Sequence, residues 1–318
     1  MSYKIGIVGC GNVGISYAYS LVNQGLDISE IVLIDIDEQR TIGKAQDLCH
    51  SLSFSRGYIN NVKYGNYEDI SDADILCITA GMPQNTKKVS RMEDIMGASK
   101  IIDIVMENVN KSNFNGIILV ASNPLDIITL KIAKLYNDDY SRVIGSGTLL
   151  DTARLRYEIA NKLDFPVRSI SGYVFGEHGD SQFVAWSSVK VNNTYNIKDY
   201  LDESEMLEIE DKVKKDGFSV ANLQGYTCYG IATALSKITR GIINNELEEL
   251  PLSTYDNEKG IYISSLSVIG RTGVIKNKLY NFKDREKELY DISSQIIKDG
   301  AKTINLMWKC WLYIKIML

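Results

Sequence analysis

The sequence has few cysteines and histidines, which limits the kinds of site that it can build. Zinc sites and disulfide frameworks use closely spaced or regularly paired cysteines. The five cysteines here show no such spacing and stand at positions 10, 49, 77, 228 and 310. Only two histidines occur, His50 and His178. We therefore expect no metal site and no disulfides, and we expect the protein to work in a reducing cytoplasm.

The sequence also lacks an excess of positive charge and a long apolar run. The chain has 35 Lys and Arg and 40 Asp and Glu, which gives a net charge of −5. Nucleic-acid binding, in contrast, needs a basic surface. The first residues show no signal peptide. The apolar segment Ile304–Leu318 is too short to cross a bilayer and contains Lys309 and Lys315. We expect neither nucleic acid nor membrane as partner, and we expect this segment to form a helix on the protein body or on a neighbouring subunit.

What is present is a regular alternation of strand-like and helix-like segments in the first half. Short apolar, β-prone runs alternate with segments of helical length and periodicity. The expected strands are 4–8, 30–34, 75–80, 116–121 and 142–144, and the expected helices are 13–24, 93–111 and 125–136. Such alternation is typical of an α/β fold with a doubly wound parallel sheet of the Rossmann type.

After about Gly145 the alternation changes. Segments 167–175, 183–191 and 261–269 have strand character, whereas 202–240 and the residues beyond Asp284 have helical character. With 318 residues the chain exceeds the usual size of a single core. We therefore predict two domains, a Rossmann nucleotide-binding domain over residues 1–144 and an α+β substrate domain over 145–318.

A glycine-rich turn follows the first predicted strand. In Gly9-Cys10-Gly11-Asn12-Val13-Gly14 the first glycine permits a tight turn, the second lets the backbone approach a pyrophosphate and the third lets helix pack on strand. Asp35 ends the second strand 21 residues beyond Gly14, where a carboxylate can bind the adenosine ribose hydroxyls and would repel a 2′-phosphate. These residues predict an NAD site.

Two tripeptides follow later strands of the same sheet. They are Thr79-Ala80-Gly81 and Ser122-Asn123-Pro124. Both are predicted to lie at the carboxyl ends of strands, where sheets of this kind bind ligands. Their small side chains would leave room for the dinucleotide, although Pro124 could equally serve only to end a strand.

A second group of residues has the chemistry of proton transfer. His178 follows a predicted strand in Gly176-Glu177-His178-Gly179-Asp180, and the flanking glycines predict an exposed loop with little packing. An imidazole near its normal pKa can accept and return the proton of a hydroxyl that is oxidised by hydride transfer. Asp151 and Arg154, three residues apart on a predicted helix, form either a plain salt bridge or a pair in which Asp151 orients the imidazole and Arg154 binds a substrate carboxylate.

Together these motifs resemble the L-lactate and malate dehydrogenase family over essentially the whole chain. The resemblance implies that His178 is the acid/base, Asp151 its partner, Arg154 the carboxylate-binding residue and Asn123 a hydrogen-bonding group near substrate and nicotinamide. Arg91 resembles the mobile arginine that polarises the substrate carbonyl. His50 also occurs in relatives without a catalytic role. The resemblance further implies a homo-oligomer, tetramer or dimer, with a 2-oxo or 2-hydroxy acid as substrate.

The family resemblance also bears on which hydroxy acid is used. Malate enzymes have an arginine three residues after the Thr-Ala-Gly glycine, and lactate enzymes a glutamine; this chain has Gln84. Gln84 cannot pair with the second carboxylate of oxaloacetate, and Thr227 also resembles the lactate type. However, the segment between Gln84 and Arg91 is one residue longer than expected and lacks the usual Pro-Gly pair, and Gly217 replaces an expected alanine. Pyruvate is therefore favoured, a bulkier acid such as 2-oxoisocaproate is the alternative, and oxaloacetate comes last.

Two other classes share a nucleotide-binding lobe of this kind. NAD-dependent glycosidases use a metal, usually with a cysteine beside the Asn-x-Pro turn, where this chain has Ser122. A non-catalytic NAD-binding module would not need an acid, its carboxylate partner and two arginines together. Metal-independent oxidation of NADH by a 2-oxo acid would exclude both.

Overall fold

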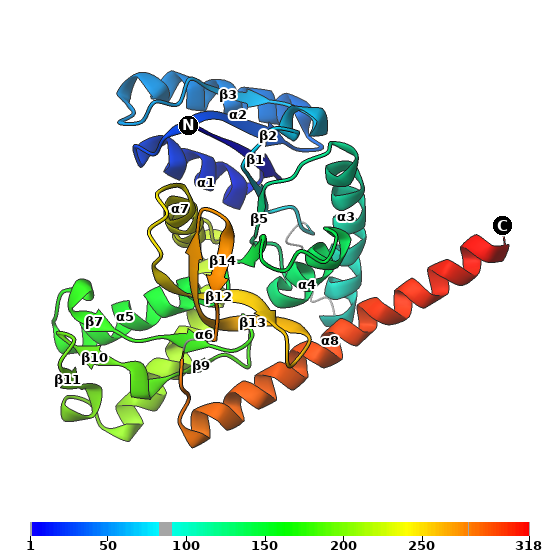
Figure 1. The fold of residues 1–318 in the computed structure, drawn as a ribbon. Coiled ribbons are helices and arrows are strands. Elements are labelled where there is room, and N and C mark those ends of the chain that lie inside the picture. Colours follow the sequence, from blue (N-terminus) through cyan, green and yellow to red (C-terminus); the bar gives the residue numbers. More distant parts are fainter. Residues whose placement is uncertain (1, 83–90, 279, 318) are drawn as a thin grey trace.

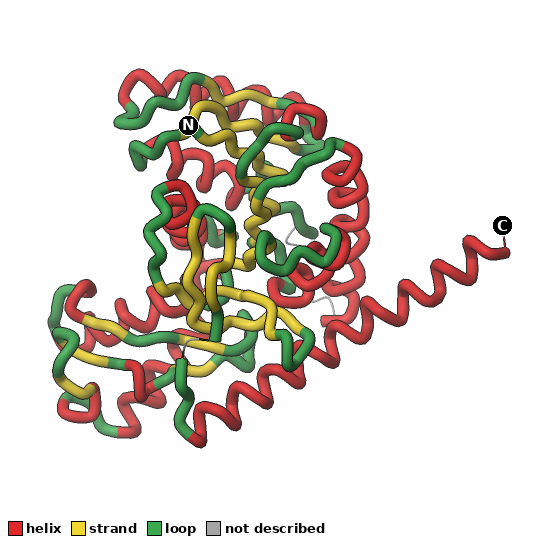
Figure 2. Tube along the Cα trace, in the orientation of Figure 1, coloured by secondary structure: helices red, strands yellow, loops and turns green. Residues whose placement is uncertain are grey.

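The computed structural model describes residues 2–82, 91–278 and 280–317, with side chains given except for residue 91 and residues 304–317. Figure 1 shows the elements of the first half gathered in the upper part of the view and most of the second half in the lower part, with β12–β14 between them. Figure 2 shows the strands of the large sheet running from the upper part of the view to its centre with helices beside them, and short strands of the second half at the lower left.

The first half forms the predicted parallel sheet. Six strands pair in parallel in the order β6-β5-β4-β1-β2-β3. They are β1 (Tyr3–Val8), β2 (Ile28–Ile34), β3 (Asn61–Tyr64), β4 (Ile75–Ile78), β5 (Ile117–Val120) and β6 (Val143–Gly145). The prediction of a doubly wound α/β fold is confirmed, although β3 at the edge of the sheet had not been predicted.

Helices cover both faces of this sheet because its strands are apolar on both sides. Alternate residues of one strand enter different cores: Ile75 and Cys77 pack with α1 (Asn12–Asn23), α2 (Glu38–Ser51) and α7 (Tyr229–Ile243), whereas Leu76 and Ile78 pack with α3 (Arg91–Lys111) and α4 (Leu125–Leu135). Burial on both faces is the usual condition of a parallel sheet. The strand ends are thereby fixed, and the loops that follow them are presented at one edge.

Three antiparallel strands from the second half extend the same sheet. β12 (Glu249–Asp256), β13 (Ile261–Gly270) and β14 (Gly273–Lys276) follow β6, so that the described residues contain a sheet of nine strands. β12 joins the parallel part at one residue pair, Ser253 with Gly145. A β-carbon at Gly145 would lie 2.8 Å from that of Ser253, so the absence of a side chain lets the two strands meet closely.

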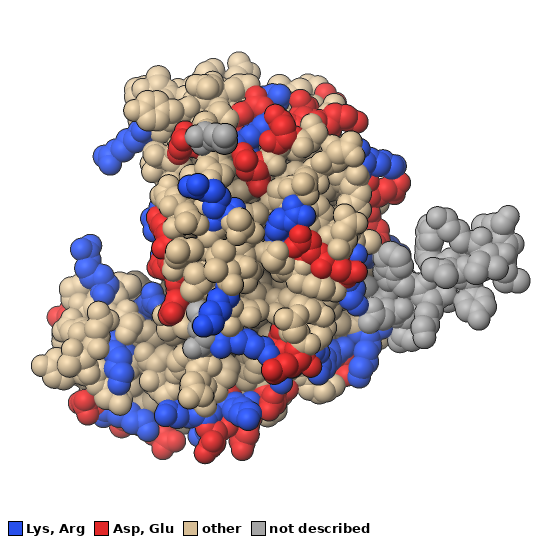
Figure 3. Space-filling model, in the orientation of Figure 1, with Lys and Arg blue, Asp and Glu red and all other residues tan. Residues whose placement is uncertain are grey.

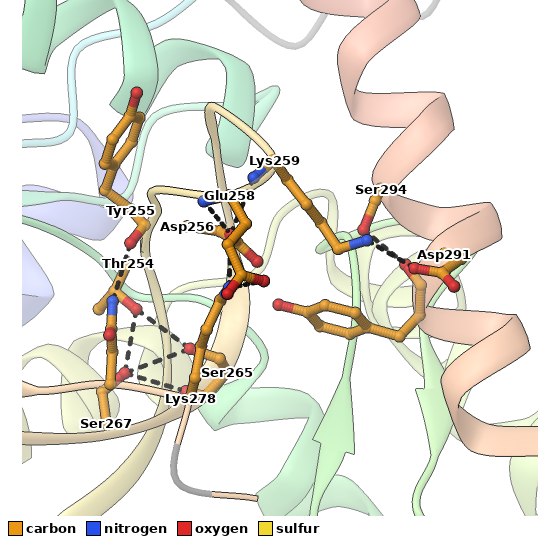
Figure 4. Close-up of polar contacts among 12 residues, drawn as sticks. Thr254, Tyr255, Asp256, Glu258, Lys259, Ser265, Ser267, Lys278, Asp291 and Ser294 are labelled. Carbon is orange, nitrogen blue, oxygen red and sulfur yellow. Dashed lines mark hydrogen bonds and ion pairs between the residues drawn. The ribbon is translucent and has the colours of Figure 1, made fainter. Parts of the chain in front are cut away.

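The β12–β13 hairpin is fixed by polar contacts in its interior and at its turn. Inside it, the Thr254 hydroxyl lies 3.1 Å from that of Ser265 and 3.0 Å from that of Ser267 (Figure 4). At the turn, Asp256 accepts hydrogen bonds from the backbone N–H groups of residues 258 and 259 and forms an ion pair with Lys278 at 2.7 Å. These contacts fix the position of the hairpin, and with it that of Ser253 in β12.

The rest of the second half forms the predicted α+β lobe. Its small strands are β7 (Ile170–Ser171), β8 (Val174–Phe175), β9 (Phe183–Val184), β10 (Lys190–Val191) and β11 (Tyr195–Asn196). α5 (Leu149–Leu163) packs against the small strands β7 and β8 and against α6 (Glu203–Gln224), and α8 (Asp284–Met317) is the last helix of the chain. The continuous strands predicted over 167–175 and 183–191 are wrong, because each contains a 3-10 turn, at Val167–Ser169 and Trp186–Ser188.

The surface carries both signs of charge. On the face in view, Lys and Arg are interspersed with Asp and Glu over both parts of the molecule (Figure 3). Among the residues that the structure describes, none of the helices has the length and apolar character needed to cross a membrane.

Candidate active site

The predicted nucleotide loop lies directly after β1 and begins α1. Gly9 has φ +92°, and a β-carbon there would lie 2.5 Å from the Ala80 nitrogen; one at Gly14 would lie 2.1 Å from the Gly9 oxygen. Both positions therefore require glycine. At Gly11, by contrast, a β-carbon would meet none of the described atoms within 4 Å.

The first turn of α1 is suited to an anion. Gly11 is its N-cap and provides no side-chain hydrogen bond to the helix, so backbone N–H groups of the first turn remain available. The open space at Gly11 adjoins these groups, and Asn12 and Val13 begin the helix. This arrangement fits a pyrophosphate, because N–H groups and the helix dipole both attract negative charge.

Asp35 lies at the end of β2 and is bonded to the same loop. Its Oδ2 accepts a hydrogen bond from the Cys10 backbone at 2.5 Å, and its Oδ1 accepts one from the Asp37 backbone at 3.0 Å. A carboxylate has about four acceptor positions, so Asp35 retains capacity for ribose hydroxyls. It also orients the glycine loop through its contact with Cys10, which no local sequence pattern indicates.

The two predicted tripeptides join this loop to the centre of the sheet edge. The Thr79 hydroxyl donates to the Gly9 carbonyl at 2.5 Å, and the Ser122 hydroxyl donates to the Ala80 carbonyl at 2.6 Å. Gly81 follows Ala80, and Asn123 is exposed beside the buried Ser122. The nucleotide loop, Thr79-Ala80-Gly81 and Ser122-Asn123 therefore form one connected edge.

One buried carboxylate holds both the histidine and the arginine of the predicted catalytic group. Asp151, 2% exposed, lies in the first turn of α5. Its Oδ2 lies 2.8 Å from His178 Nδ1, and its Oδ1 accepts a hydrogen bond from Arg154 Nη1 at 2.8 Å. With Nδ1 engaged in this way, Nε2 is the ring nitrogen left to face a substrate.

The charges of this group shift its pKa values. Burial lowers the pKa of the His178 imidazole, but the charge of Asp151 and its hydrogen bond outweigh that effect and hold the pKa above its usual value. Burial likewise would raise the pKa of Asp151, yet His178 and Arg154 together keep it below its usual value. His178 is therefore disposed to carry a proton, and Asp151 to remain ionised beside it.

The loop of His178 is packed more firmly than the flanking glycines had predicted. Gly179 and Asp180 are exposed, but Glu177 is 6% exposed and its backbone N–H donates to the Ser293 hydroxyl of α8 at 2.6 Å. The backbone N–H of His178 donates to the Asp126 carboxylate of α4 at 2.9 Å. The prediction of a loosely packed loop is therefore wrong for Glu177 and His178, because α8 and α4 accept hydrogen bonds from their backbone N–H groups.

For the other residues predicted to contact the substrate, the structure gives only a position in the chain or none. Thr227 is half-buried in the connection between α6 and α7. Arg91 is the first residue of α3, with its side chain outside the described part. Gln84 lies outside the described residues. Their roles remain predictions.

α6 adds two residues beside Arg154 that bear on the size of the substrate site. A β-carbon at Gly217 would lie 3.4 Å from Arg154 Nη2, at ordinary contact distance. The carboxyl of its neighbour Asp216 has a raised pKa, because burial and the charge of Glu158 outweigh the attraction of Arg154 and Lys212. The glycine therefore leaves a space next to the guanidinium that an alanine would fill.

Within the described residues, groups of three or more His, Cys, Asp or Glu arranged to hold a metal ion do not occur. The described residues instead form a glycine loop suited to a nucleotide and a buried carboxylate, Asp151, that is bonded to both His178 and Arg154. Two family models match the chain. The model of the lactate/malate dehydrogenase NAD binding domain matches residues 3–145, and the model of the lactate/malate dehydrogenase alpha/beta C-terminal domain matches residues 148–305. The chain belongs to the lactate/malate dehydrogenase family.

As a member of the lactate/malate dehydrogenase family, the chain is an NAD-dependent oxidoreductase that acts on a CH–OH group. L-lactate dehydrogenase 1 of Listeria innocua is 41% identical over 313 residues, covering 95% of this chain and 98% of that protein. A lactate dehydrogenase from a Medee basin deep-sea metagenome library superposes with a TM-score of 0.90 at 37% sequence identity, covering 96% of this chain and 99% of that chain. The structure of malate dehydrogenase from Salinibacter ruber superposes with a TM-score of 0.89 at 24% sequence identity, covering 96% of this chain and 99% of that chain. At this identity the likeness shows the fold alone.

Proposed function

We propose that the chain is an L-lactate dehydrogenase, which reduces pyruvate with NADH to L-lactate and catalyses the reverse reaction. The observation that carries this proposal is the single carboxylate of Asp151 bonded to both His178 and Arg154. It brings a proton donor and a group for the substrate carboxylate into one place. The names of the relatives, L-lactate dehydrogenases at about 40% identity, support the choice of acid.

In this proposal each residue of the group has one task. Arg154 binds the pyruvate carboxylate through two parallel hydrogen bonds. His178 donates the Nε2 proton to the carbonyl oxygen, and Asp151 stabilises the imidazolium before transfer. Bound NADH would supply the hydride that C2 of pyruvate accepts. Asn123 and Arg91 would bind the carbonyl oxygen and stabilise its developing charge.

The NAD site of this proposal uses the connected edge of the sheet. Backbone groups at the start of α1 bind the pyrophosphate and Asp35 binds the adenosine ribose. The full set of proposed contact residues is Gly9, Gly11, Asn12, Val13, Gly14, Asp35, Thr79, Ala80, Gly81, Ser122 and Asn123. A metal has no part in the proposed reaction.

The wider setting follows from the reaction. Reducing pyruvate regenerates NAD⁺, so we propose a role in fermentation downstream of glycolysis, in the cytoplasm. We propose a homotetramer, with a dimer as the alternative, and a division into an NAD-binding domain over residues 1–144 and a substrate domain over 145–318. Sedimentation of the purified protein would distinguish the two oligomers.

Replacing Gln84 with Arg should move the substrate preference toward oxaloacetate. An arginine there could pair with the second carboxylate, whereas the neutral amide leaves that charge without a partner. We expect the ratio of kcat/KM for oxaloacetate to that for pyruvate to rise by about 100-fold, equivalent to about 3 kcal/mol for one charge-assisted pair. Steady-state rates with NADH and pyruvate, 2-oxobutyrate, 2-oxoisocaproate and oxaloacetate measure this.

The same panel tests the proposed function on the unmodified protein. Preference for pyruvate supports it, preference for 2-oxoisocaproate would favour an L-2-hydroxyisocaproate dehydrogenase, and preference for oxaloacetate would show that the Gln84 argument fails. Gln84→Lys is the matched control: it adds the charge without the planar guanidinium, so a smaller shift is expected.

The space beside Arg154 is the feature that favours bulkier acids. Gly217→Ala would place a methyl group 3.4 Å from the guanidinium. We expect kcat/KM for 2-oxoisocaproate to fall several-fold relative to pyruvate, while replacing a helical glycine adds up to about 1 kcal/mol of stability. Substrate ratios and thermal unfolding measure the two effects.

Gly43→Ala provides the control for this prediction. Gly43 is an exposed helical glycine of α2, and a β-carbon there would meet none of the described atoms within 4 Å. It should gain stability with an unchanged substrate ratio. An equal ratio in Gly217→Ala and the wild type would show that the space does not receive the substrate side chain.

A further inference from the structure

A second buried carboxylate lies behind the loop that carries His178. Asp126 is in the first turn of α4 and is 2% exposed. Its Oδ2 accepts the hydrogen bond from the backbone N–H of His178 at 2.9 Å, and its Oδ1 accepts one from the Ser253 hydroxyl at 2.5 Å. The proposed proton-transfer chemistry uses the His178 ring and leaves this carboxylate without a task.

The position of Asp126 in the chain connects two parts of the proposed site. It stands three residues after Asn123, on the same short segment that begins α4. Ser122 on that segment is bonded to Ala80, as described above, and Thr79 is bonded to the nucleotide loop. A rigid helix start is therefore fixed to the nucleotide edge at one end and to the backbone of His178 at the other.

The third partner is equally well fixed. Ser253 lies in β12, whose hairpin is held by the Thr254, Ser265 and Ser267 hydroxyls (Figure 4). Since Ser253 is fully buried and donates to Asp126, the carboxylate is restrained from two directions. His178 therefore depends on Asp126 for the place of its backbone and on Asp151 for the orientation of its ring.

We propose that Asp126 is a positioning residue, which holds the His178 backbone at a fixed distance from Asn123 and the nucleotide edge and adds negative charge behind the imidazole. This inference rests on the proposed role of His178 as proton donor. A hydroxyl or amide could accept the same backbone hydrogen bond, so the presence of a buried charge needs a reason of its own.

The charged groups around His178 give that reason. Asp151 and Arg154 face it from α5, Asp126 from α4, and Glu177 precedes it in its own loop. Asp126 helps Asp151 to raise the His178 pKa against the effect of burial. Burial raises the pKa of Asp126 itself to about 6, although hydrogen bonds from Ser253 and His178 oppose the rise. Above that pH the carboxylate is charged and favours the imidazolium.

Asp126→Asn tests this role because it keeps the shape and removes the charge. We expect kcat for pyruvate reduction to fall about tenfold, with the Kd of NADH changed less than twofold. The reduction requires protonated His178 and is lost as pH rises through its pKa. The basic limb of the pH profile of kcat/KM should therefore move to lower pH by about half a unit or more, because a nearby negative charge no longer supports the imidazolium.

Thr129→Val is the matched control in the same helix. Thr129 is fully buried one turn further on, and its hydroxyl donates only to the Leu125 carbonyl in the described contacts. It should keep the wild-type kcat and pH profile. If Thr129→Val reproduces the effects of Asp126→Asn, or if Asp126→Asn has the wild-type kcat and profile, the inference is overturned.

Two further variants keep the test decisive. If Asp126→Asn does not fold, Ser253→Ala replaces it: a severalfold loss of kcat at unchanged NADH affinity supports positioning, and a wild-type kcat overturns it. His178→Asn separates this inference from the proposed function. Wild-type turnover in His178→Asn would refute the function itself, whereas an inactive His178→Asn beside a fully active Asp126→Asn would refute only the positioning role.

Discussion

His178→Asn should lower kcat for pyruvate reduction by several orders of magnitude while NADH binding stays nearly intact. General acid–base catalysis contributes about 10²- to 10⁴-fold, and asparagine cannot carry the transferred proton. The amide can still bond to Asp151, which keeps Arg154 in place. Steady-state kinetics gives kcat, and titration of the NADH fluorescence gives Kd.

The second histidine is the control for this result. His50 is exposed near the end of α2, and His50→Asn should have wild-type kinetics. Retention of more than about a tenth of the wild-type kcat by His178→Asn would contradict the assigned proton donor, because the loss would then be smaller than general acid catalysis accounts for.

Asp151→Asn should also be severely impaired, with a distinct pH dependence. We expect kcat/KM for pyruvate to fall by at least about 100-fold, because the amide cannot accept hydrogen bonds from both His178 and Arg154 through two oxygens. The charge of Asp151 helps to hold the His178 pKa above its usual value. Without it burial is less opposed, the pKa falls, and protonated His178 is lost at a lower pH.

The measurement is the pH profile of kcat/KM, whose basic limb should move to lower pH. Asp164→Asn is the control, since Asp164 is exposed at the other end of α5 in the left-handed conformation that asparagine also tolerates. It should keep the wild-type profile. A basic limb that does not move in Asp151→Asn would show that Asp151 does not set the protonation of His178.

Local sequence signals predicted the parts of the site that depend on neighbouring residues. The glycine loop can be recognised from a strand, a turn and a helix start that follow one another in the sequence. The contact between Asp151 and Arg154 can be recognised from their spacing of three residues on a helix. Each could therefore be found from a few adjacent positions. Five strands of the first half were predicted for the same reason, since each is a short apolar run between turn residues, whereas the edge strand β3 is only partly buried and was not predicted.

The parts that were missed depend on contacts between distant segments. β12 contains Pro251, which argues against a central strand because proline has no N–H to donate. The structure accommodates it because β12 meets β6 at one residue pair. In the sequence, Asp126 is simply an acidic residue in the first turn of a helix, where acidic residues are common. Its partners His178 and Ser253 lie 52 and 127 residues away, and no local pattern indicates them.

The continuity of the sheet through β6 and β12 constrains how this enzyme can move. Backbone hydrogen bonds link strands from both halves of the chain into one sheet. A hinge between the halves would have to break the pairing of Ser253 with Gly145 and leave unpaired backbone groups at the edges of β6 and β12. We therefore expect substrate enclosure to come from segments outside the sheet, with a barrier that reflects local loop ordering rather than the reorientation of two lobes.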